Sequence, residues 1–310
     1  MNNPRPNIQF ASAPVSWGVQ DFRDAAWDQP WERVLDEIAA AGYQGTELGP
    51  YGFYPVDPAQ LQPALQSRKL AMLSAFVPVA LSEPALAAQA VDHVRKVGKV
   101  LAALKGPLLV LSDAQTPDRQ RMAGRVPADG SSSLKPDQWQ NVGEVLREIE
   151  KVADEFGLAA VFHPHVATHI ETPAEVQRLF ETLSGTGIGL CLDTGHCVYG
   201  GGDPLEEARK YRALLRYVHI KDINAEVLGE ARRRRLTFAE AVAQGVFSQI
   251  GKGCIYFPAF FRLLREIGYC GWAIVEQDIE YGKSVVRPVE SMKAGLDYLK
   301  NVLSGAQDAA

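Results

Sequence analysis

Short apolar runs alternate with amphipathic segments along nearly the whole chain. Most of the runs are apolar at consecutive positions, which is typical of a strand buried on both faces of a parallel sheet. Eight such runs are predicted as strands, at residues 8–14, 44–48, 70–77, 107–111, 158–162, 188–192, 215–220 and 272–276. The segments between them carry apolar residues at helical spacing, as Trp31, Val34 and Ile38 do. The predicted helices are residues 30–41, 57–68, 84–104, 137–156, 173–183, 203–211, 257–267 and 288–302.

Eight strands, each followed by helical material, predict one (β/α)8 TIM barrel over residues 1–310. An open doubly wound sheet is the alternative, but it normally carries a glycine-rich phosphate loop after its first strand. Residues 14–18, Pro-Val-Ser-Trp-Gly, are not such a loop. Residues 224–256 interrupt the alternation after the seventh strand and are predicted as an insertion with a helix at 237–243. Residues 304–310 are predicted as a frayed tail.

Composition narrows the class of protein. Apolar residues make up 46% of the 310 residues and charged residues 22%, which is ordinary for a soluble globular protein. The net charge of −5 disfavours nucleic acid as a partner. The sequence has no long apolar run and no signal peptide, so we expect a cytoplasmic protein without a membrane partner. The four cysteines lack Cys-x-x-Cys spacing and are interpreted as reduced thiols.

Polar side chains follow the last four predicted strands, where the active site of a parallel barrel lies. His163 follows the fifth strand, Asp193 the sixth, His219 lies near the end of the seventh and Glu276 ends the eighth. Imidazole and carboxylate ligands in this mixture favour Mn²⁺ or Co²⁺, with Zn²⁺, Fe²⁺ and Mg²⁺ as alternatives. No cysteine is placed with them, which argues against a closed structural zinc site.

Each of these residues also has an interpretation that needs no metal. Asp193 stands where a buried strand meets a turn, so it either pairs with a cation or caps the following segment. The whole set is alternatively a rim of ion pairs and caps. Glu47, at the end of the second strand, either contacts a substrate or forms a salt bridge on the rim. Trp17 either walls a sugar-sized pocket or belongs to the core.

These residues carry a resemblance to the xylose-isomerase-like barrel superfamily, which includes sugar isomerases, keto-sugar epimerases and endonucleases acting at abasic sites. The resemblance covers nearly the whole chain, and within the superfamily it points to the myo-inosose-2 dehydratases of inositol catabolism. The segments that carry it are Gly-Tyr-Gln-Gly-Thr-Glu-Leu-Gly at 42–49, Phe-His-Pro-His-Val-Ala-Thr-His-Ile-Glu-Thr at 162–172, Leu-Asp-Thr-Gly-His at 192–196, Val-His-Ile-Lys-Asp at 218–222, Gly-Val-Phe at 245–247 and Gly-Tyr-Cys-Gly-Trp-Ala-Ile-Val-Glu-Gln at 268–277.

The resemblance implies three metal ligands, Asp193, His219 and Glu276. A fourth slot, filled by Glu in the epimerases, holds His163 in this sequence. Epimerases use two carboxylates, one on each face of the substrate carbon, so His163 favours a dehydratase with one base and one acid. The first strand also departs from the pattern of a typical inosose dehydratase, at residues 13–18.

The resemblance therefore implies a metal-dependent lyase that dehydrates 2-keto-myo-inositol or a related polyol ketone through an enolate. His165 or Glu276 would take the α-proton, and Lys221, His196 or water at the metal would supply the acid. Glu47, Trp17 and His169 are the predicted substrate contacts.

Three other functions stay open beside the lyase. A ketose or keto-inositol isomerase or epimerase would use the same metal. An abasic-site endonuclease is disfavoured by the six histidines and the acidic balance. The third is a sugar-binding barrel without catalysis. A small-molecule polyol or keto-sugar is the expected partner of the lyase and of the isomerase or epimerase, and a homo-oligomer stays open.

Overall fold

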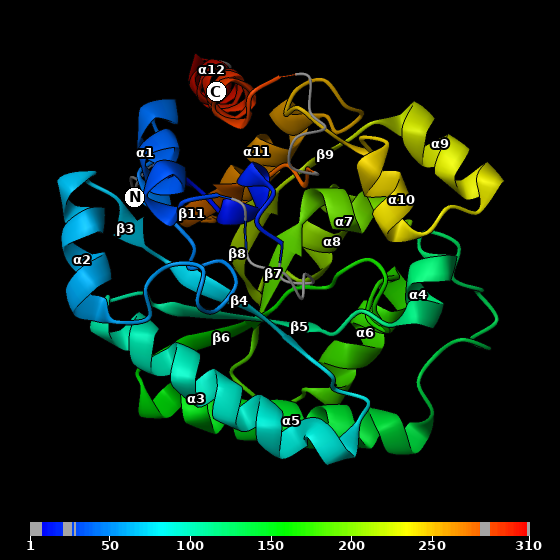
Figure 1. The fold of residues 1–310 in the computed structure, drawn as a ribbon. Helices are drawn as coiled ribbons and strands as arrows, with labels where there is room; N and C mark the ends of the chain where they lie inside the picture. The colour runs from blue at the N-terminus through cyan, green and yellow to red at the C-terminus, as the bar shows by residue number, and fades with distance from the viewer. Residues whose placement is uncertain (1–7, 21–26, 28, 280–285, 309–310) are drawn as a thin grey trace.

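Parallel strands around one axis and helices outside them form the fold (Figure 1). The computed structural model describes residues 8–20, 27, 29–279 and 286–308. Nine strands follow one another in the order β3-β2-β1-β11-β8-β7-β6-β5-β4. They are β1 (Ile8–Ser12), β2 (Gly45–Thr46), β3 (Ala71–Met72), β4 (Ser74–Val79), β5 (Leu108–Asp113), β6 (Ala159–Phe162), β7 (Gly189–Asp193), β8 (Leu215–Ile220) and β11 (Gly271–Val275).

The barrel closes at the third stave, which Leu73 divides into β3 and β4. On one side Leu73 donates its amide to Thr46, and Leu48 donates to Ser74, at 3.0 and 2.8 Å. On the other side Leu108 donates to the Leu73 carbonyl at 3.2 Å. With β3 and β4 counted as one stave, the nine strands make the eight of a TIM barrel, so the predicted fold class is confirmed.

Eight helices follow the staves and cover the outside of the barrel (Figure 1). They are α1 (Trp31–Ala41), α2 (Pro58–Ser67), α3 (Ala87–Ala103), α5 (Pro136–Glu155), α6 (Pro173–Thr182), α8 (Pro204–Lys210), α11 (Phe257–Glu266) and α12 (Pro288–Asp308). Local signals fix their ends. Thr172 and Glu175 form a reciprocal capping box at the start of α6, and Gly42 ends α1 at a φ of 96°. Among the described residues no helix is both long enough and apolar enough to cross a membrane.

Four short helices lie in loops at the carboxyl ends of the strands. They are α4 (Pro117–Met122), α7 (Thr194–Tyr199), α9 (Ala225–Arg234) and α10 (Phe238–Ala243). The sequence predicted only α10, because the other three are short or polar segments without a clear apolar stripe. These helices surround the mouth of the barrel.

The segment 224–256 is tied to the barrel at both of its ends. β9 (Asp222–Ile223) pairs antiparallel with β10 (Phe247–Ser248). The Asp222 carboxylate accepts hydrogen bonds from the amides of Gly251, Gly253 and Ile255 at 2.9–3.1 Å. α9 and α10 lie between these anchors and are therefore held over the barrel mouth.

The C-terminal prediction was wrong over residues 304–308. Helix α12 continues to Asp308, and residues 309–310 lie outside the described part of the chain. Residues 304–310 are predicted as a tail because chain ends commonly fray. Gly305 does not stop the helix, since a single glycine lowers helix stability by only about 1 kcal/mol relative to alanine. Packing of the preceding turns keeps the helix continuous: Met292, Leu296 and Leu299 are buried.

The inside of the barrel is filled by a separate apolar layer. Its members are buried apolar side chains and one tyrosine: Ala11, Ala13, Leu73, Val110, Val161, Cys191, Tyr217 and Ile274. The hydroxyl groups of Tyr217 and Ser74 lie 2.9 Å apart within it. This apolar layer fills the interior of the barrel, so any ligand must enter from the carboxyl ends of the strands.

Candidate active site

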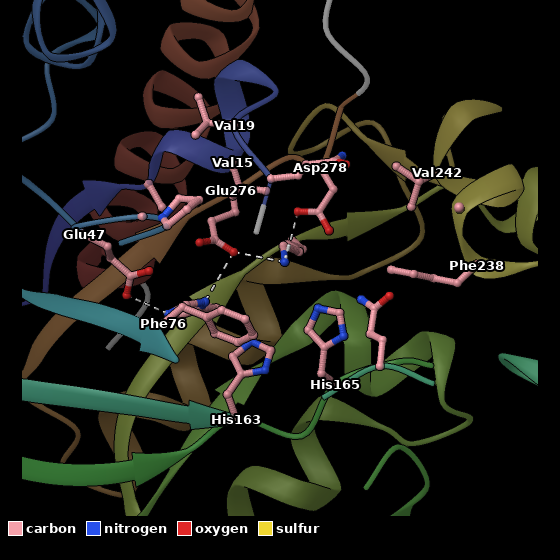
Figure 2. A pocket seen from close by; sticks show the side chains of 18 of the residues that line it. Val15, Val19, Glu47, Phe76, His163, His165, Phe238, Val242, Glu276 and Asp278 are labelled. Atoms are coloured by element: carbon pink, nitrogen blue, oxygen red, sulfur yellow. Dashed lines mark hydrogen bonds and ion pairs between the residues drawn. The ribbon is translucent and has the colours of Figure 1, made fainter. Parts of the chain in front are cut away.

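A cavity of about 440 Å³ opens above this apolar layer (Figure 2). Its volume lies within the range of small-molecule sites. The charged and imidazole side chains that line it are Glu47, His163, His165, His219, Lys221, Glu276 and Asp278. Its apolar walls come from Val15 and Val19 after β1, from Phe76 on β4, and from Phe238 and Val242 on α10. Segments distant in sequence thus build the cavity together. We call its charged and imidazole side chains, with the buried Asp193 beside them, the polar floor.

The buried ammonium of Lys221 lies at the centre of the polar floor. Its Nζ is 3.0 Å from Glu276 Oε2, 3.1 Å from Asp278 Oδ1 and 3.4 Å from Asp193 Oδ2. Burial on its own would lower the pKa of Lys221, but these three carboxylates outweigh it and raise that pKa well above its usual value. Lys221 is therefore a positive charge shared by three carboxylates.

The backbone around Lys221 is fixed by the turn after β7. The Thr194 hydroxyl donates to the Lys221 carbonyl at 2.7 Å, and the Lys221 amide lies 3.0 Å from the same oxygen. A Cβ on Gly195 would lie 2.6 Å from the Lys221 Cβ. Only glycine permits this approach, so Asp-Thr-Gly-His is a packing motif as well as a chemical one.

His219 lies between two carboxylates. Its Nε2 is 3.1 Å from Glu47 Oε1, and its Nδ1 is 3.3 Å from Glu276 Oε2. Glu47 also accepts a hydrogen bond from the Ser74 hydroxyl at 2.7 Å. Burial alone would lower the pKa of His219, but the negative groups around the ring, Glu276 and Glu47 among them, raise that pKa well above its usual value. Glu47 is thus part of the polar floor.

Asp193 performs both of the roles that its sequence position indicated. Oδ1 caps α7 by accepting the His196 amide hydrogen at 2.8 Å. Oδ2 faces the polar floor, 3.5 Å from His163 Nε2. Burial on its own would raise the pKa of Asp193, but Lys221 and the nearby imidazoles hold it well below its usual value. One oxygen therefore serves the fold, and the other is directed at the candidate active site.

The four predicted metal ligands come together as parts of two groups. In the first, ligand atoms of His163, Asp193 and His196 lie within 4.8 Å of one another. In the second, the same holds for Glu47, His219 and Glu276. The Lys221 ammonium contacts Asp193 in one group and Glu276 in the other. A metal ion and this ammonium would therefore compete for the same two carboxylates.

Several buried atoms on the polar floor have no hydrogen-bond partner among the described residues. They are His163 Nδ1, Asp193 Oδ2, His219 Nδ1 and Asp278 Oδ1. The last three make ion-pair contacts of 3.1–3.4 Å with Lys221 or Glu276, so only His163 Nδ1 has neither kind of partner in the part of the chain that the structure describes. Such atoms are costly to bury unless a ligand or an ion satisfies them. Imidazole nitrogens and carboxylate oxygens together suit a divalent first-row metal, so the residues present fit such an ion.

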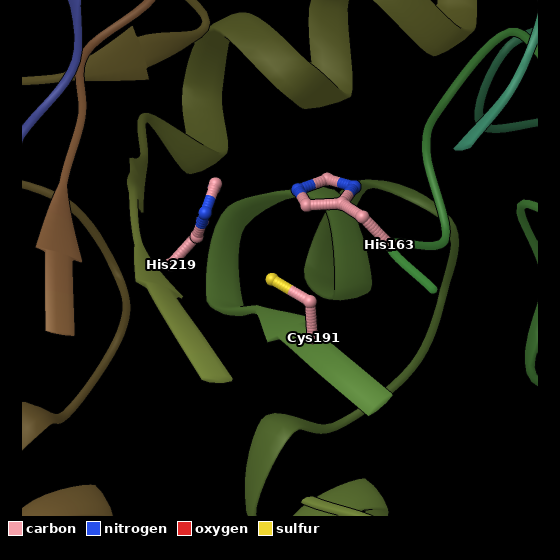
Figure 3. A group of neighbouring side chains, drawn as sticks. All are labelled: His163, Cys191 and His219. Atoms are coloured by element: carbon pink, nitrogen blue, oxygen red, sulfur yellow. The ribbon is translucent and has the colours of Figure 1, made fainter. Parts of the chain in front are cut away.

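Cys191 belongs with these side chains, contrary to the sequence prediction. Figure 3 shows its sulfur near the rings of His163 and His219, and one ligand atom from each lies within 4.8 Å of the others. The expectation that no cysteine accompanies the histidines was wrong. Because side chains alternate along a strand, Cys191 lies on the same face of β7 as Asp193. Burial raises the pKa of the Cys191 thiol to about 11, so it is protonated at neutral pH.

Two histidine rings, tilted by 37° to one another, lie beside Lys221. The rings of His165 and His196 lie 3.8 Å apart between centroids. His165 Nδ1 is 2.7 Å from the Val166 carbonyl, which can only accept, so Nδ1 carries the proton and Nε2 is left as an acceptor. Burial lowers the pKa of His165 to about 3. Of the two rings, only His165 lines the cavity; His196 lies behind it and contacts Lys221 Nζ at 3.1 Å.

Two predicted substrate contacts lie elsewhere. Trp17 is buried in the hydrophobic core and does not line the cavity. Its indole N–H donates a hydrogen bond to Glu37 at 2.8 Å. His169 faces Asp113, with its amide 2.9 Å from Asp113 Oδ2, and also lies outside the cavity lining. We therefore do not retain either residue as a substrate contact.

The sequence analysis missed Asp278, which lines the cavity 3.1 Å from Lys221. Period-two alternation from Glu276 was the signal that could have identified it, because both residues then point to one side. Burial is the main cause that raises the pKa of Asp278, to about 6. The wall residues Phe238 and Val242 were also missed, since they come from the insertion rather than from a strand.

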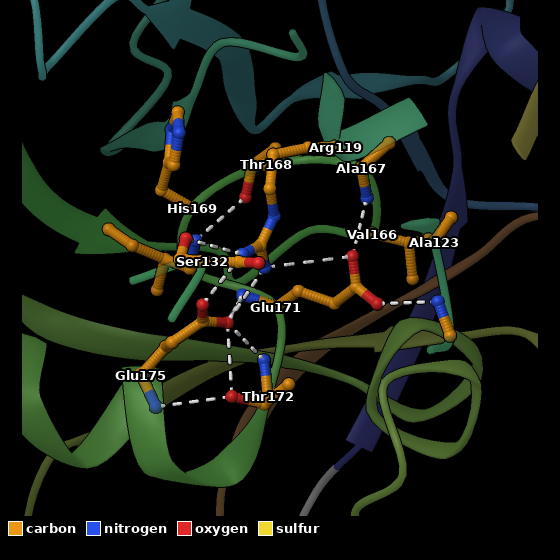
Figure 4. Close-up of polar contacts among 12 residues, drawn as sticks. Arg119, Ala123, Ser132, Val166, Ala167, Thr168, His169, Glu171, Thr172 and Glu175 are labelled. Carbon is orange, nitrogen blue, oxygen red and sulfur yellow. Dashed lines mark hydrogen bonds and ion pairs between the residues drawn. The ribbon is translucent and has the colours of Figure 1, made fainter. Parts of the chain in front are cut away.

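A second buried charge cluster, which we call the Arg119 network, lies outside the cavity lining (Figure 4). Arg119 on α4 makes two hydrogen bonds of 2.9 Å to the two oxygens of Glu175. Glu171 accepts from the amides of Gly124 and Ala167 at 2.7 and 2.9 Å. The network joins α4 to the loop between β6 and α6, which also carries His165.

Family comparison agrees with this architecture. The family model described as xylose isomerase-like TIM barrel matches residues 35–302. The chain is 31% identical to the rhizopine catabolism protein MocC of Rhizobium meliloti, over 98% of this chain and 91% of that protein. It is 28% identical to the inosose dehydratase of Clostridium botulinum (strain Alaska E43 / Type E3), over 96% of this chain and 98% of that protein.

Solved structures with the same fold are more distant in sequence. The apo 3-keto-D-glucoside 4-epimerase YcjR from E. coli has a TM-score of 0.70 and 18% identity, covering 95% of this chain and 100% of that chain. The IOLI protein with a bound zinc atom has a TM-score of 0.71 and 16% identity, covering 96% of this chain and 99% of that chain. At these identities the likeness shows the fold alone.

Proposed function

The chain belongs to the xylose isomerase-like TIM barrel family, and from this we propose that it is a metal-dependent hydro-lyase acting on a keto-inositol. The proposed substrate is 2-keto-myo-inositol or a closely related polyol ketone, and the proposed product is the dehydrated ketone formed through an enolate. The relatives named inosose dehydratase support this substrate class. The proposal also places the enzyme in the cytoplasm and in inositol catabolism.

One observation carries the proposal: a proton acceptor and a proton donor line the same cavity. The bond from His165 Nδ1 to the Val166 carbonyl leaves Nε2 free to accept a proton. The Lys221 ammonium lines the cavity as well, held by Glu276 and Asp278. Elimination of water from a hydroxyketone needs one group of each kind.

A divalent metal, Mn²⁺ or Co²⁺ by the chemistry of the donors, would be held by His163, Asp193, His219 and Glu276. When bound, it supplies Lewis-acid polarisation of the substrate carbonyl. The unpartnered His163 Nδ1 supports this assignment, as do Asp193 Oδ2 and His219 Nδ1, which make ion pairs but no hydrogen bond. Glu47 holds the other side of His219 and thereby orients the ring.

In the proposed reaction, His165 Nε2 removes the proton on the carbon beside the carbonyl. The electron pair of that C–H bond forms the enolate, and its collapse breaks the C–O bond at the β-carbon. The Lys221 ammonium donates a proton to the departing hydroxyl group, so that water leaves. The two residues regain their starting states when the proton on His165 returns to Lys221 through solvent. The apolar walls of Phe76 and Phe238 limit the access of bulk water to the enolate.

An isomerase or epimerase is the second candidate, and one observation favours it. Glu47 and Glu276 both line the cavity and flank His219 on its two nitrogens. The cavity therefore offers two carboxylates even though His163 replaces the Glu of the epimerase pattern. Such an enzyme would exchange the α-proton with solvent without releasing water.

The test uses one incubation and two measurements. The purified protein is dialysed against a chelator and incubated with 2-keto-myo-inositol in deuterated water, with and without added Mn²⁺ or Co²⁺. We expect metal-dependent absorbance from an enone or dione product. Full turnover without metal would refute the metal-dependent mechanism. Deuterium incorporation into a ketone that keeps all its hydroxyl groups, with no enone or dione formed, would favour the isomerase or epimerase instead.

A further inference from the structure

Two glutamines line the cavity beside its polar floor. Gln115 lies in the loop between β5 and α4, and Gln120 lies on α4. Neither residue takes part in the proposed proton transfers. They stand on the part of the wall where α4 meets α10, since Ala239 at the start of α10 lines the same cavity.

A chain of hydrogen bonds fixes how both amide groups are turned. The Ala239 backbone N–H donates to Gln120 at 3.2 Å, and because a backbone N–H can only donate, the atom it meets must be the Gln120 oxygen. The Gln120 nitrogen therefore faces Gln115 and donates to the Gln115 oxygen. This leaves the Gln115 nitrogen as the free end of the chain. The orientation follows from the backbone donor and does not depend on how the amide atoms are named.

The free end is a donor without an acceptor. Gln115 Nε2 is buried and has no hydrogen-bond partner among the residues that the structure describes. A buried amide donor left unpaired lowers stability, so such groups are normally satisfied by protein, water or ligand. Gln115 lines the cavity, and a bound ligand can supply the missing acceptor.

We propose that the Gln115 amide donates a hydrogen bond to an oxygen atom of the polyol substrate, and that Gln120 is the positioning residue that sets its polarity. The substrate class rests on the proposed function. The pair would make the cavity selective for a polyol that has an oxygen at this point on its ring. A buried donor discriminates strongly against a ligand that leaves it unpaired.

Gln115→Met removes the donor and keeps the size of the side chain. With 2-keto-myo-inositol we expect KM to rise about tenfold while kcat stays within threefold, because the lost contact is equally strong before and during the reaction. Gln66→Glu, at an exposed position on α2, is the control for substitution of a glutamine. An unchanged KM in Gln115→Met would overturn the proposal.

A panel of monodeoxy analogues of 2-keto-myo-inositol separates recognition from a structural effect. One analogue is expected to lose about tenfold in kcat/KM with the wild type and nothing further with Gln115→Met. Equal losses in both proteins for every analogue would show that Gln115 contacts no substrate hydroxyl.

Gln120→Glu tests the positioning role. A carboxylate still accepts from the Ala239 amide, so the contact between α4 and α10 is kept. Its other oxygen attracts the Gln115 nitrogen and turns the Gln115 oxygen toward the ligand. We expect KM to rise about threefold, since a substrate hydroxyl can partly adapt by donating. A purely structural role predicts the wild-type KM.

Binding calorimetry with myo-inositol keeps this inference distinct from the proposed reaction. If the wild type binds myo-inositol but does not turn over 2-keto-myo-inositol, the lyase is wrong, and a tenfold weaker Kd in Gln115→Met still supports the role of Gln115. If Gln115→Met binds as tightly as the wild type, the role of Gln115 is wrong whatever the reaction. Absence of binding of either compound to the wild type removes the polyol and overturns both.

Discussion

Two buried charge clusters lie near the barrel mouth, and they differ in how completely their polar atoms are paired. In the Arg119 network, both oxygens of Glu171 and of Glu175 accept hydrogen bonds. Among the described side chains of this network, only Arg119 Nε lacks a hydrogen-bond partner. Around Lys221, four buried atoms on His163, Asp193, His219 and Asp278 make no hydrogen bond to any residue that the structure describes, and three of the four are held by ion pairs alone. We call the Arg119 network closed, because its carboxylates are fully hydrogen-bonded. We call the cluster around Lys221 open, because several of its buried polar atoms are not.

His196 illustrates the open cluster. Its Nδ1 lies 3.4 Å from the Val166 amide, and its Nε2 lies 3.1 Å from the Lys221 ammonium. A neutral imidazole accepts through one nitrogen only, so both contacts cannot be hydrogen bonds in a single tautomer. The Arg119 network has no such conflict. We infer that the closed network holds the fold, whereas the open one needs a ligand, an ion or a proton to satisfy its polar atoms.

The largest expected effect is on the open cluster. Lys221→Met is expected to lower kcat with 2-keto-myo-inositol by about a thousandfold, because the proton donor is removed. Steady-state kinetics on the metal-loaded protein measures it. Lys99→Met, at an exposed position on α3, is the matched control and should keep wild-type activity. A loss of less than tenfold in Lys221→Met would exclude Lys221 as the acid.

The closed network is expected to respond in stability instead. Arg119→Met leaves the Glu175 and Glu171 carboxylates buried without their guanidinium partner, so the free energy of unfolding should fall by about 3–5 kcal/mol. Urea denaturation measures this. The kcat of the remaining folded protein should stay within threefold. Arg121→Met on the same helix, where the side chain is exposed, should change stability by less than about 0.5 kcal/mol. A thousandfold loss of kcat in Arg119→Met would erase the distinction between the two clusters.

The pH dependence of stability gives a third comparison. Burial is the main cause that raises the pKa of Glu171 from 4.5 to about 7, so between these values the folded state keeps a proton that the unfolded state has lost. The contribution of Glu171 to stability must then fall as pH rises through this window, by about 3 kcal/mol in total. Urea denaturation across this range should show that the free energy of unfolding of the wild type falls, relative to that of Glu171→Gln, as pH rises. A difference independent of pH would contradict the shift.

The competition between the Lys221 ammonium and a metal ion predicts a change in metal affinity when Lys221 is replaced. Because the Lys221 ammonium contacts Asp193 and Glu276, its removal should free both carboxylates for a cation. We expect Lys221→Met to bind Mn²⁺ about tenfold more tightly than the wild type, an effect of about 1.4 kcal/mol. Calorimetric titration of the chelator-treated proteins measures it. Weaker binding in the variant would mean that the ammonium and the metal do not compete.

The smallest effect is expected at Cys191. Its thiol is protonated at neutral pH, and carboxylates and imidazoles already supply the ligands, so Cys191→Ala should keep Mn²⁺ affinity and kcat within threefold. Loss of one buried sulfur should lower stability by about 1 kcal/mol. A tenfold fall in Mn²⁺ affinity would make Cys191 a ligand.

The sequence by itself determined the alternation of strands and helices, and therefore the barrel. Buried strands and amphipathic helices are periodic patterns, and eight repeats allow few closed arrangements. The barrel topology then assigned a common rim to His163, Asp193, His219 and Glu276, because residues at the carboxyl ends of parallel strands must meet. Asp278 and Cys191 were not predicted, although two-residue alternation places Asp278 on the side of Glu276 and Cys191 on the side of Asp193.

The tertiary structure alone decided which atoms of that rim face one another. In the structure the Lys221 ammonium lies between Asp193 and Glu276. Trp17 and His169, which were predicted to contact substrate, lie outside the cavity lining, whereas Gln115 and Phe238, which were not predicted, belong to it. A strand pattern fixes the side of the sheet on which a residue lies. It does not fix the rotamer of a long side chain or the path of an inserted loop, because both depend on packing between segments far apart in the sequence.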